Sequence, residues 1–158
     1  YKRIKNRLSM EKILIKVDNI KQLKNKLNKA QGFVIVDVND EKILRAVIND
    51  KKVNMIINVE NSANKDFMHA RNSGLNQVLC KILKERNIVV GFSFDTVYNK
   101  EGMDRAILLG RMMQNARICR KFKVKTAVVD FQGRCEKDLN SFGACIGLTN
   151  RDFDVIKC

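Results

Sequence analysis

Four nearly continuous runs of apolar, mostly β-branched residues constrain the fold of this chain more than any other feature. They occupy residues 33–38, 53–59, 88–94 and 126–131. Continuous apolar runs of this length are typical of strands that are covered on both faces, as in parallel sheets. Residues 13–17 indicate one more strand near the start of the chain.

Each of the four runs is preceded by a helical pattern of apolar residues. The helix caps give the starting points: Asp18 or Asn19 for the first helix, Asn39 or Asp40 for the second, and Ser73 for the third. We predict a long fourth helix at residues 103–122 and a shorter fifth helix at residues 137–144.

Strands that alternate with helices in this order require parallel crossovers, so the fold class is α/β. The sheet is then either open or part of a barrel, and a complete eight-fold barrel takes about 250 residues. We predict a single domain over residues 1–158, and the pattern leaves both an open parallel sheet and a truncated or irregular barrel open. The chain begins with Tyr1 rather than Met, so we expect native N-terminal residues to be missing.

The charge balance favours a polyanionic partner. Lys and Arg number 31 against 17 Asp and Glu, a formal net charge of +14, although solubility alone is an alternative reason for such a surplus. The five cysteines contain no Cys-x-x-Cys pair, so neither a disulfide framework nor a zinc ribbon is indicated. We expect a cytoplasmic protein without a membrane segment, because no apolar stretch approaches about 20 residues.

Catalytic signatures are scarce. Metal-dependent phosphoesterases of barrel type gather several His with Asp or Glu, whereas this sequence has one histidine, His69. Asp37 and Glu60 lie where active-site carboxylates of parallel sheets often lie, but helix capping or pairing with arginine is the commoner role. The sequence also lacks a Gly-x-Ser-x-Gly elbow and a phosphate-binding glycine loop. We expect this chain to have no catalytic residue, no bound metal and no cofactor.

The basic residues gather on and after the long predicted helix. On a helical wheel its buried stripe consists of Leu108, Leu109, Met112, Ala116 and Cys119. The opposite side carries Arg111, Gln114, Arg117 and Lys121.

Because the dipole of a helix accounts for only part of this cluster, we predict a phosphate-binding surface. The predicted RNA-binding residues are Arg71, Arg105, Arg111, Arg117, Arg120, Lys121, Lys123 and Lys125. The predicted residues for a partner protein are Ile107, Gln114 and Ile118. Aromatic residues are few, which favours recognition of a folded RNA through its backbone over base stacking.

Two blocks of the sequence resemble ribonuclease P protein component 3. In the first, Arg71 is followed by Ser73-Gly74-Leu75-Asn76 and an apolar helix. The second covers residues 105–124 and ends in Cys119-Arg120-Lys121 before Val124. Weaker similarity extends the match to residues 33–150, although the first strand and the turn Gly133-Arg134-Cys135 depart from the family pattern.

This resemblance implies an irregular or incomplete (β/α) TIM-like barrel with parallel strands, related to the polymerase-and-histidinol-phosphatase hydrolases but without their metal cluster. It implies a subunit of the ribonuclease P ribonucleoprotein, which removes the 5′ leader from precursor tRNA. The expected partners are the catalytic RNA, protein component 2 in a heterotetramer with two copies of each, the other ribonuclease P proteins and, indirectly, precursor tRNA. The RNA and its Mg²⁺ would perform the reaction, and this chain would raise activity electrostatically. A metal-dependent phosphoesterase of the related superfamily is the alternative.

Overall fold

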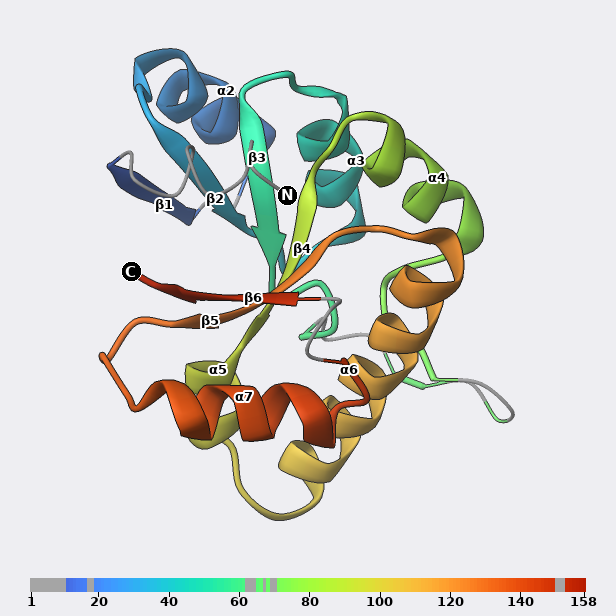
Figure 1. Cartoon of the computed structure of the whole chain (residues 1–158). Coiled ribbons are helices and arrows are strands. Elements are labelled where there is room, and N and C mark those ends of the chain that lie inside the picture. Colours follow the sequence, from blue (N-terminus) through green and yellow to red (C-terminus); the bar gives the residue numbers. More distant parts are fainter. Residues whose placement is uncertain (1–10, 17–18, 62–64, 67, 69–70, 150–152) are drawn as a thin grey trace.

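The computed structural model describes residues 11–16, 19–61, 65–66, 68, 71–149 and 153–158. It contains a sheet of six parallel strands whose spatial order equals their order in the chain (Figure 1). The strands are β1 (Lys12–Lys16), β2 (Phe33–Asp37), β3 (Val53–Ile57), β4 (Val89–Ser93), β5 (Thr126–Asp130) and β6 (Phe153–Lys157). The sheet curls into a half-barrel, and Nζ of Lys12 in β1 donates a hydrogen bond to the carbonyl of Lys157 in β6. The predicted fold class, an incomplete α/β TIM-like barrel, is confirmed.

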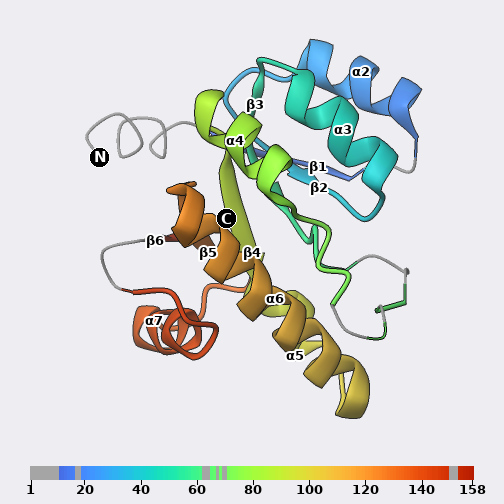
Figure 2. The same ribbon diagram turned by 90° about the vertical axis from the view of Figure 1, so that its right-hand side faces the viewer.

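Helices alternate with the strands, as predicted. They are α2 (Ile20–Lys29), α3 (Glu41–Asn49), α4 (Gln77–Glu85), α5 (Phe94–Tyr98), α6 (Gly102–Phe122) and α7 (Glu136–Cys145). Figure 2 shows α2, α3 and α4 side by side, with α6 running past the end of the sheet towards α5. The short helix α5 and the strand β6 were not predicted, because neither has a long apolar pattern.

One predicted helix cap is wrong. Asn76, not Ser73, caps α4, and its side chain accepts a hydrogen bond from the backbone N–H of Leu79 at 2.9 Å. Ser73 lies three residues earlier and is buried, and its carbonyl accepts a hydrogen bond from α6. The other two predicted caps include the observed ones, Asn19 for α2 and Asp40 for α3.

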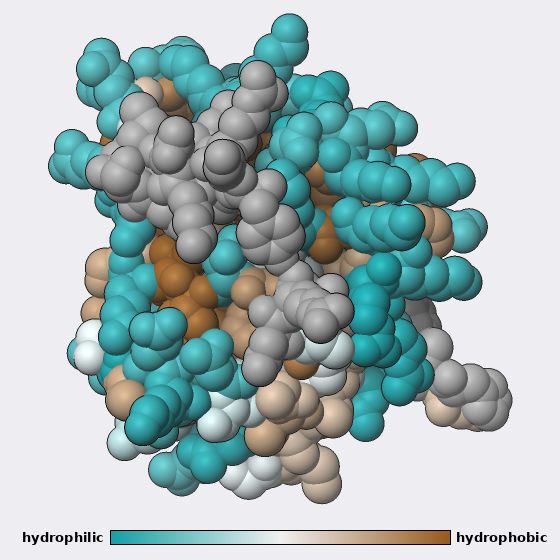
Figure 3. All heavy atoms as spheres, viewed as in Figure 1, coloured by the Kyte–Doolittle hydropathy of each residue, from teal (hydrophilic) through white to brown (hydrophobic). Residues whose placement is uncertain are grey.

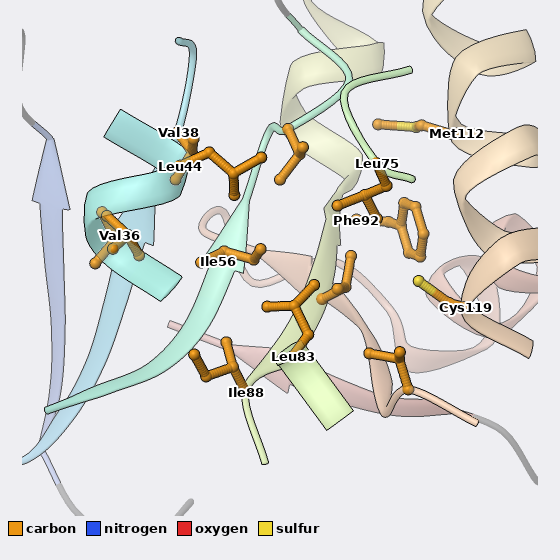
Figure 4. Close-up of a cluster of buried hydrophobic side chains, with 14 of the residues drawn as sticks. Val36, Val38, Leu44, Ile56, Leu75, Leu83, Ile88, Phe92, Met112 and Cys119 are labelled. Atoms are coloured by element: carbon orange, nitrogen blue, oxygen red, sulfur yellow. The ribbon is translucent and has the colours of Figure 1, made fainter. Parts of the chain in front are cut away.

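The sheet has an apolar cluster on each face, which explains the continuous apolar runs of the sequence. Side chains such as Val36, Ile56 and Phe92 pack towards the helices (Figure 4). Their neighbours along the strands pack on the other face, in a cluster of Phe33, Ile35, Met55, Ile57, Val89, Ala127, Val129 and Ile156. Gly91 leaves space in this second layer, because a Cβ atom there would lie 2.7 Å from Cγ2 of Ile57.

Candidate functional site

The carboxyl ends of the strands carry polar side chains that bind one another. Asp37 ends β2, and its Oδ1 accepts a hydrogen bond from Nδ2 of Asn58 at 2.8 Å. Oγ1 of Thr96 donates in turn to Oδ1 of Asn58 at 2.7 Å. Asn58 has a φ of 62°, a left-handed conformation that asparagine adopts more readily than most residues. This network joins the segments that follow β2, β3 and β4.

Glu60, in the connection after β3, is completely buried. Nδ2 of Asn115 in α6 donates to Oε2 of Glu60 at 3.4 Å. Burial raises the pKa of Glu60 to about 7, and the nearby charge of Asp37 acts in the same direction. The protonated and ionised forms are therefore both present near neutral pH. Among the described residues, Oε1 of Glu60, Oγ of Ser73 and Oδ1 of Asn115 have no hydrogen-bond partner.

Arg134 joins the carboxyl ends of β4 and β5. Its Nη1 donates to Oδ1 of Asp95 at 2.5 Å and to Oδ1 of Asp130 at 2.6 Å. Its guanidinium also lies over the rings of Phe94 and Tyr98, 4.9 and 4.8 Å from their centroids. Burial acts to raise the pKa of Asp130, but hydrogen bonds from Arg134 and its positive charge outweigh burial and lower that pKa. Both carboxylates are thus paired with the same cation of the chain itself.

The described residues contain no group of three or more His, Cys, Asp or Glu side chains able to hold a metal ion. His69 lies outside the described residues. None of the helices that the structure describes is long and apolar enough to cross a membrane.

The two sequence blocks singled out above lie against each other. Nδ2 of Asn115 donates to the carbonyl of Ser73 at 2.8 Å, and Nε2 of Gln114 donates to the carbonyl of Arg71 at 3.2 Å. The guanidinium of Arg71 lies directly over Gly110, where a Cβ atom would be 1.2 Å from its Nη1. The connection before α4 is therefore held to α6 by residues of both blocks.

Gly74 is required for the same connection. Its φ of 82° is left-handed, and a Cβ atom at this position would lie 2.5 Å from the carbonyl oxygen of Val59. Any other residue would combine backbone strain with a steric clash. The backbone conformation thus explains why a glycine follows Ser73 in the first block.

The predicted position of Arg111 on the outer side of α6 is wrong. Its exposed fraction is 6%, its Nε donates to Oδ1 of Asp66 at 2.7 Å, and its Nη1 donates to the carbonyl of Glu60 at 3.2 Å. The wheel assumed that α6 is covered from one side only, whereas the connection between β3 and α4 covers a second side. Arg111 and Asn115 are consequently buried together with Met112.

Asp66 was missed because nothing in the local sequence indicates its pairing with a residue 45 positions away. Burial acts to raise the pKa of Asp66, but hydrogen bonds from the backbone N–H of Asn72 and from Arg111, together with the charge of Arg111, lower it. Asp95, Asp130 and Arg134 were also missed. The rule that selected Asp37, a carboxylate at the end of an apolar strand, would have found Asp130.

The predicted partner-protein residues are less exposed than the sequence suggested. Ile107, Gln114 and Ile118 are half-buried, and Ile118 packs against the main apolar core. Ile107 and Gln114 instead line an open groove of about 780 Å³ beside α6. The groove contains three exposed methionines, Met68, Met103 and Met113. The partner role of these residues stays a prediction.

The other predicted RNA-binding residues are exposed. They are Arg71, Arg105, Arg117, Arg120, Lys121, Lys123 and Lys125. Arg105 donates to the carbonyls of Lys100 and Tyr98, and Arg120 donates to the carbonyl of Gly147 at 3.3 Å. These bonds leave the positive charges unneutralised, and RNA contact by these residues stays a prediction.

Comparisons with known proteins give one curated relative and one solved structure of note, while no protein-family model matches the sequence. The chain is 24% identical over 119 residues to ribonuclease P protein component 3 of Methanocaldococcus jannaschii, covering 73% of this chain and 48% of that protein. It thus spans about half the length of this relative.

The fold matches that of a chain in the cryo-EM structure of archaeal ribonuclease P with mature tRNA. The TM-score is 0.68 at 22% identity, and the match covers 88% of this chain and 61% of that chain. The sequence similarity and the shared fold, added to the contact between the two blocks, confirm that this chain resembles ribonuclease P protein component 3.

Proposed function

We propose that this chain acts as a non-catalytic protein subunit of ribonuclease P, the ribonucleoprotein that removes the 5′ leader from precursor tRNA. In this role it binds the catalytic RNA through its surplus of cations and binds a second protein subunit. The RNA and its Mg²⁺ perform the cleavage, and the chain raises the activity by reducing repulsion between phosphates.

The contact between the two blocks is the observation that carries this proposal. If the resemblance were accidental, nothing would require Arg71 and Ser73 of the first block to meet Gln114 and Asn115 of the second. The residues that resemble the family are instead those that lock the connection after β3 onto α6. A shared structural purpose of this kind supports common ancestry with component 3.

The carboxyl ends of the strands support a non-catalytic role for this chain. In enzymes with parallel β/α barrels, the chemistry takes place at this end of the sheet. Here Asp95 and Asp130 are bound by Arg134, and Asp66 is bound by Arg111. A substrate phosphate or a metal ion would have to displace these internal ion pairs.

The groove beside α6 supports the second half of the proposal. Its exposed methionines, Ile107 and Ala106 form an apolar surface with arginines at its margin, which suits a protein partner better than RNA. By the resemblance, that partner is ribonuclease P protein component 2, in a heterotetramer with two copies of each subunit.

Reconstitution tests the proposal. The chain and component 2, added together to archaeal ribonuclease P RNA at moderate Mg²⁺, are expected to raise cleavage of precursor tRNA above that of the RNA alone. A basic protein of similar size and charge but unrelated fold is the matched control. Equal stimulation by this control, or none by the folded chain with component 2, would contradict the proposal.

The alternative function, a metal-dependent phosphoesterase, predicts a different result. Purified chain would then hydrolyse a phosphoester without RNA, and a chelator would abolish the activity. Loss of that activity in an Asp37→Asn variant would place the reaction at the carboxyl ends of the strands and would contradict a non-catalytic role.

A further inference from the structure

One edge of the sheet carries a clear excess of cations over carboxylates. Because the strands are parallel, the connections that lead from α3, α4 and α6 into the next strand all arrive at the edge where the strands begin. We call this edge the amino-end edge. Its cations, all exposed, are Lys51 and Lys52 before β3, Lys84 and Arg86 before β4, and Lys123 and Lys125 before β5.

The acidic residues are distributed in the opposite way. The three connections at the amino-end edge, together with the last turn of α4, hold two carboxylates, Asp50 and Glu85, against six cations. Of the 15 acidic residues that the structure describes, eleven lie at strand carboxyl ends, in the connections that follow or in the first turns of α3, α5, α6 and α7. They are Asp37, Asp40, Glu41, Glu60, Asp66, Asp95, Glu101, Asp104, Asp130, Glu136 and Asp138. The described carboxylates therefore gather on the side of the strand carboxyl ends, whereas cations outnumber carboxylates at the amino-end edge.

The cations of the amino-end edge are not neutralised by described carboxylates. The ion pairs among the described residues involve Arg45, Arg111 and Arg134. At the edge, Nζ of Lys52 instead donates to the carbonyls of Leu27 and Asn28. These bonds to neutral groups fix the position of the ammonium group and leave its positive charge unneutralised.

Two further bonds act in the same way. Nη1 of Arg86 donates to the carbonyl of Asn49 at 3.0 Å, and Nζ of Lys125 donates to Oδ1 of Asn87 at 3.4 Å. These contacts join neighbouring connections, so the edge presents partly ordered positive charge.

Helix dipoles explain only part of this arrangement. A cation in the last turn of a helix is stabilised by about 0.3–1 kcal/mol, and the effect fades beyond that turn. Lys84 lies in the last turn of α4, whereas Lys51, Lys52 and Lys125 lie outside the helices. In Figure 3, hydrophilic side chains cover the upper and right-hand margins, where Figure 1 places the ends of α3, α4 and α6, and they also cover the left-hand margin.

We propose that the amino-end edge of the sheet, opposite to the end where barrel enzymes perform chemistry, is the surface on which this chain binds the phosphate backbone of RNA. This inference rests on the proposed function and goes further, because it assigns RNA contact to Lys51, Lys52, Lys84 and Arg86. It also excludes the predicted contacts Arg71 and Arg105, which lie on the side of the strand carboxyl ends. The internally paired, acid-rich carboxyl ends face away from the RNA.

A pair of triple variants with equal charge tests this inference. The first variant combines Lys51→Gln, Lys84→Gln and Lys123→Asn, three exposed side chains; asparagine suits the left-handed backbone of Lys123. The control combines Lys42→Gln, Lys100→Gln and Lys137→Gln, which lie on the side of the strand carboxyl ends. Both variants lose three positive charges, and thermal unfolding checks that both are folded.

The affinity of each protein for ribonuclease P RNA is measured as a function of KCl concentration. Each phosphate contact contributes roughly 0.9 to the slope of log affinity against log salt, so the first variant is expected to lose about two to three slope units. The control is expected to lose less than about one unit.

The outcomes separate this inference from the proposed function. Equal losses in the two variants would show that only net charge matters and would overturn the amino-end edge. A wild-type slope retained by the first variant would also overturn it while leaving RNA binding intact. Failure of the wild-type chain to bind with salt dependence would contradict both proposals.

Discussion

Arg111 provides the sharpest test of the structure, because sequence and structure assign it opposite roles. An exposed arginine that contacts RNA tolerates substitution without loss of stability, usually within about 0.5 kcal/mol. The structure instead places the guanidinium in a buried position, bound to Asp66 and to the carbonyl of Glu60. Substitution Arg111→Ala is therefore expected to destabilise the fold.

The magnitude follows from the exposure of the two partners. Breaking a fully buried pair costs about 3–5 kcal/mol. The side chain of Arg111 is 7% exposed but that of Asp66 is 28% exposed, so water can partly solvate the carboxylate that is left behind. We expect a loss of about 2–3 kcal/mol, which for a chain of this length corresponds to a fall in Tm of roughly 5–10 °C.

The loss should depend on pH. The pKa of Asp66 is lower in the folded chain than its ordinary value of 3.8, so the stabilisation is complete above that value. It is lost as the pH falls through the folded pKa. The difference in stability between wild type and Arg111→Ala is therefore expected to be full at pH 7 and to shrink under acidic conditions.

Thermal and urea unfolding measure the effect, with Arg117→Ala as the matched control on the exposed side of the same helix. The control is expected to keep the wild-type Tm. Unchanged stability of Arg111→Ala, combined with a reduced salt slope of RNA binding, would refute the buried position of Arg111 and restore the prediction from the helical wheel.

Three further substitutions test the described contacts by unfolding measurements. Glu60 has a folded pKa of about 7, above its ordinary 4.5, so the wild-type chain loses roughly 3 kcal/mol of stability between these pH values. Glu60→Gln should therefore be more stable than wild type at pH 8 but not at pH 4; equal pH profiles would contradict the burial of this carboxyl. Arg134→Ala leaves the completely buried Asp130 without its cation and should cost about 3–5 kcal/mol, whereas a cost below about 1 kcal/mol would contradict the observed pairing. Gly91→Ala places a methyl group against Ile57 in the second apolar layer of the sheet and should cost about 1–3 kcal/mol of stability. A stabilised variant would show that this layer is packed more loosely than described.

The residues that resemble component 3 have structural roles within this chain. The family motif around Ser73 and Gly74 is explained by backbone geometry and by the hydrogen bond from Asn115. Neither feature requires RNA. The motif residues therefore define the shape of the connection, while the cations exposed around the sheet carry the proposed binding.

Periodicity alone determined most of the fold of this chain. The strands β2, β3, β4 and β5 and all helices except α5 follow from apolar patterns that depend on neighbours along the chain. β6 was not predicted because it contains the charged residue Asp154 and lacks a long apolar pattern. The strand order was not predicted from these patterns, although the observed order is the usual one for consecutive parallel strands with helical crossovers.

The site depended on contacts that no local pattern contains. A helical wheel assigns one buried face to α6, but the connection holding Asp66 and Ser73 covers another side and turns Arg111 and Asn115 into buried residues. Opposite charges 39 and 45 positions apart, as in Asp95–Arg134 and Asp66–Arg111, meet only after folding. The sequence by itself determined the number and sign of the charges and the elements that carry them. Only the tertiary structure decided which charges are neutralised, because Coulomb energy depends on distance in space and on solvent exposure.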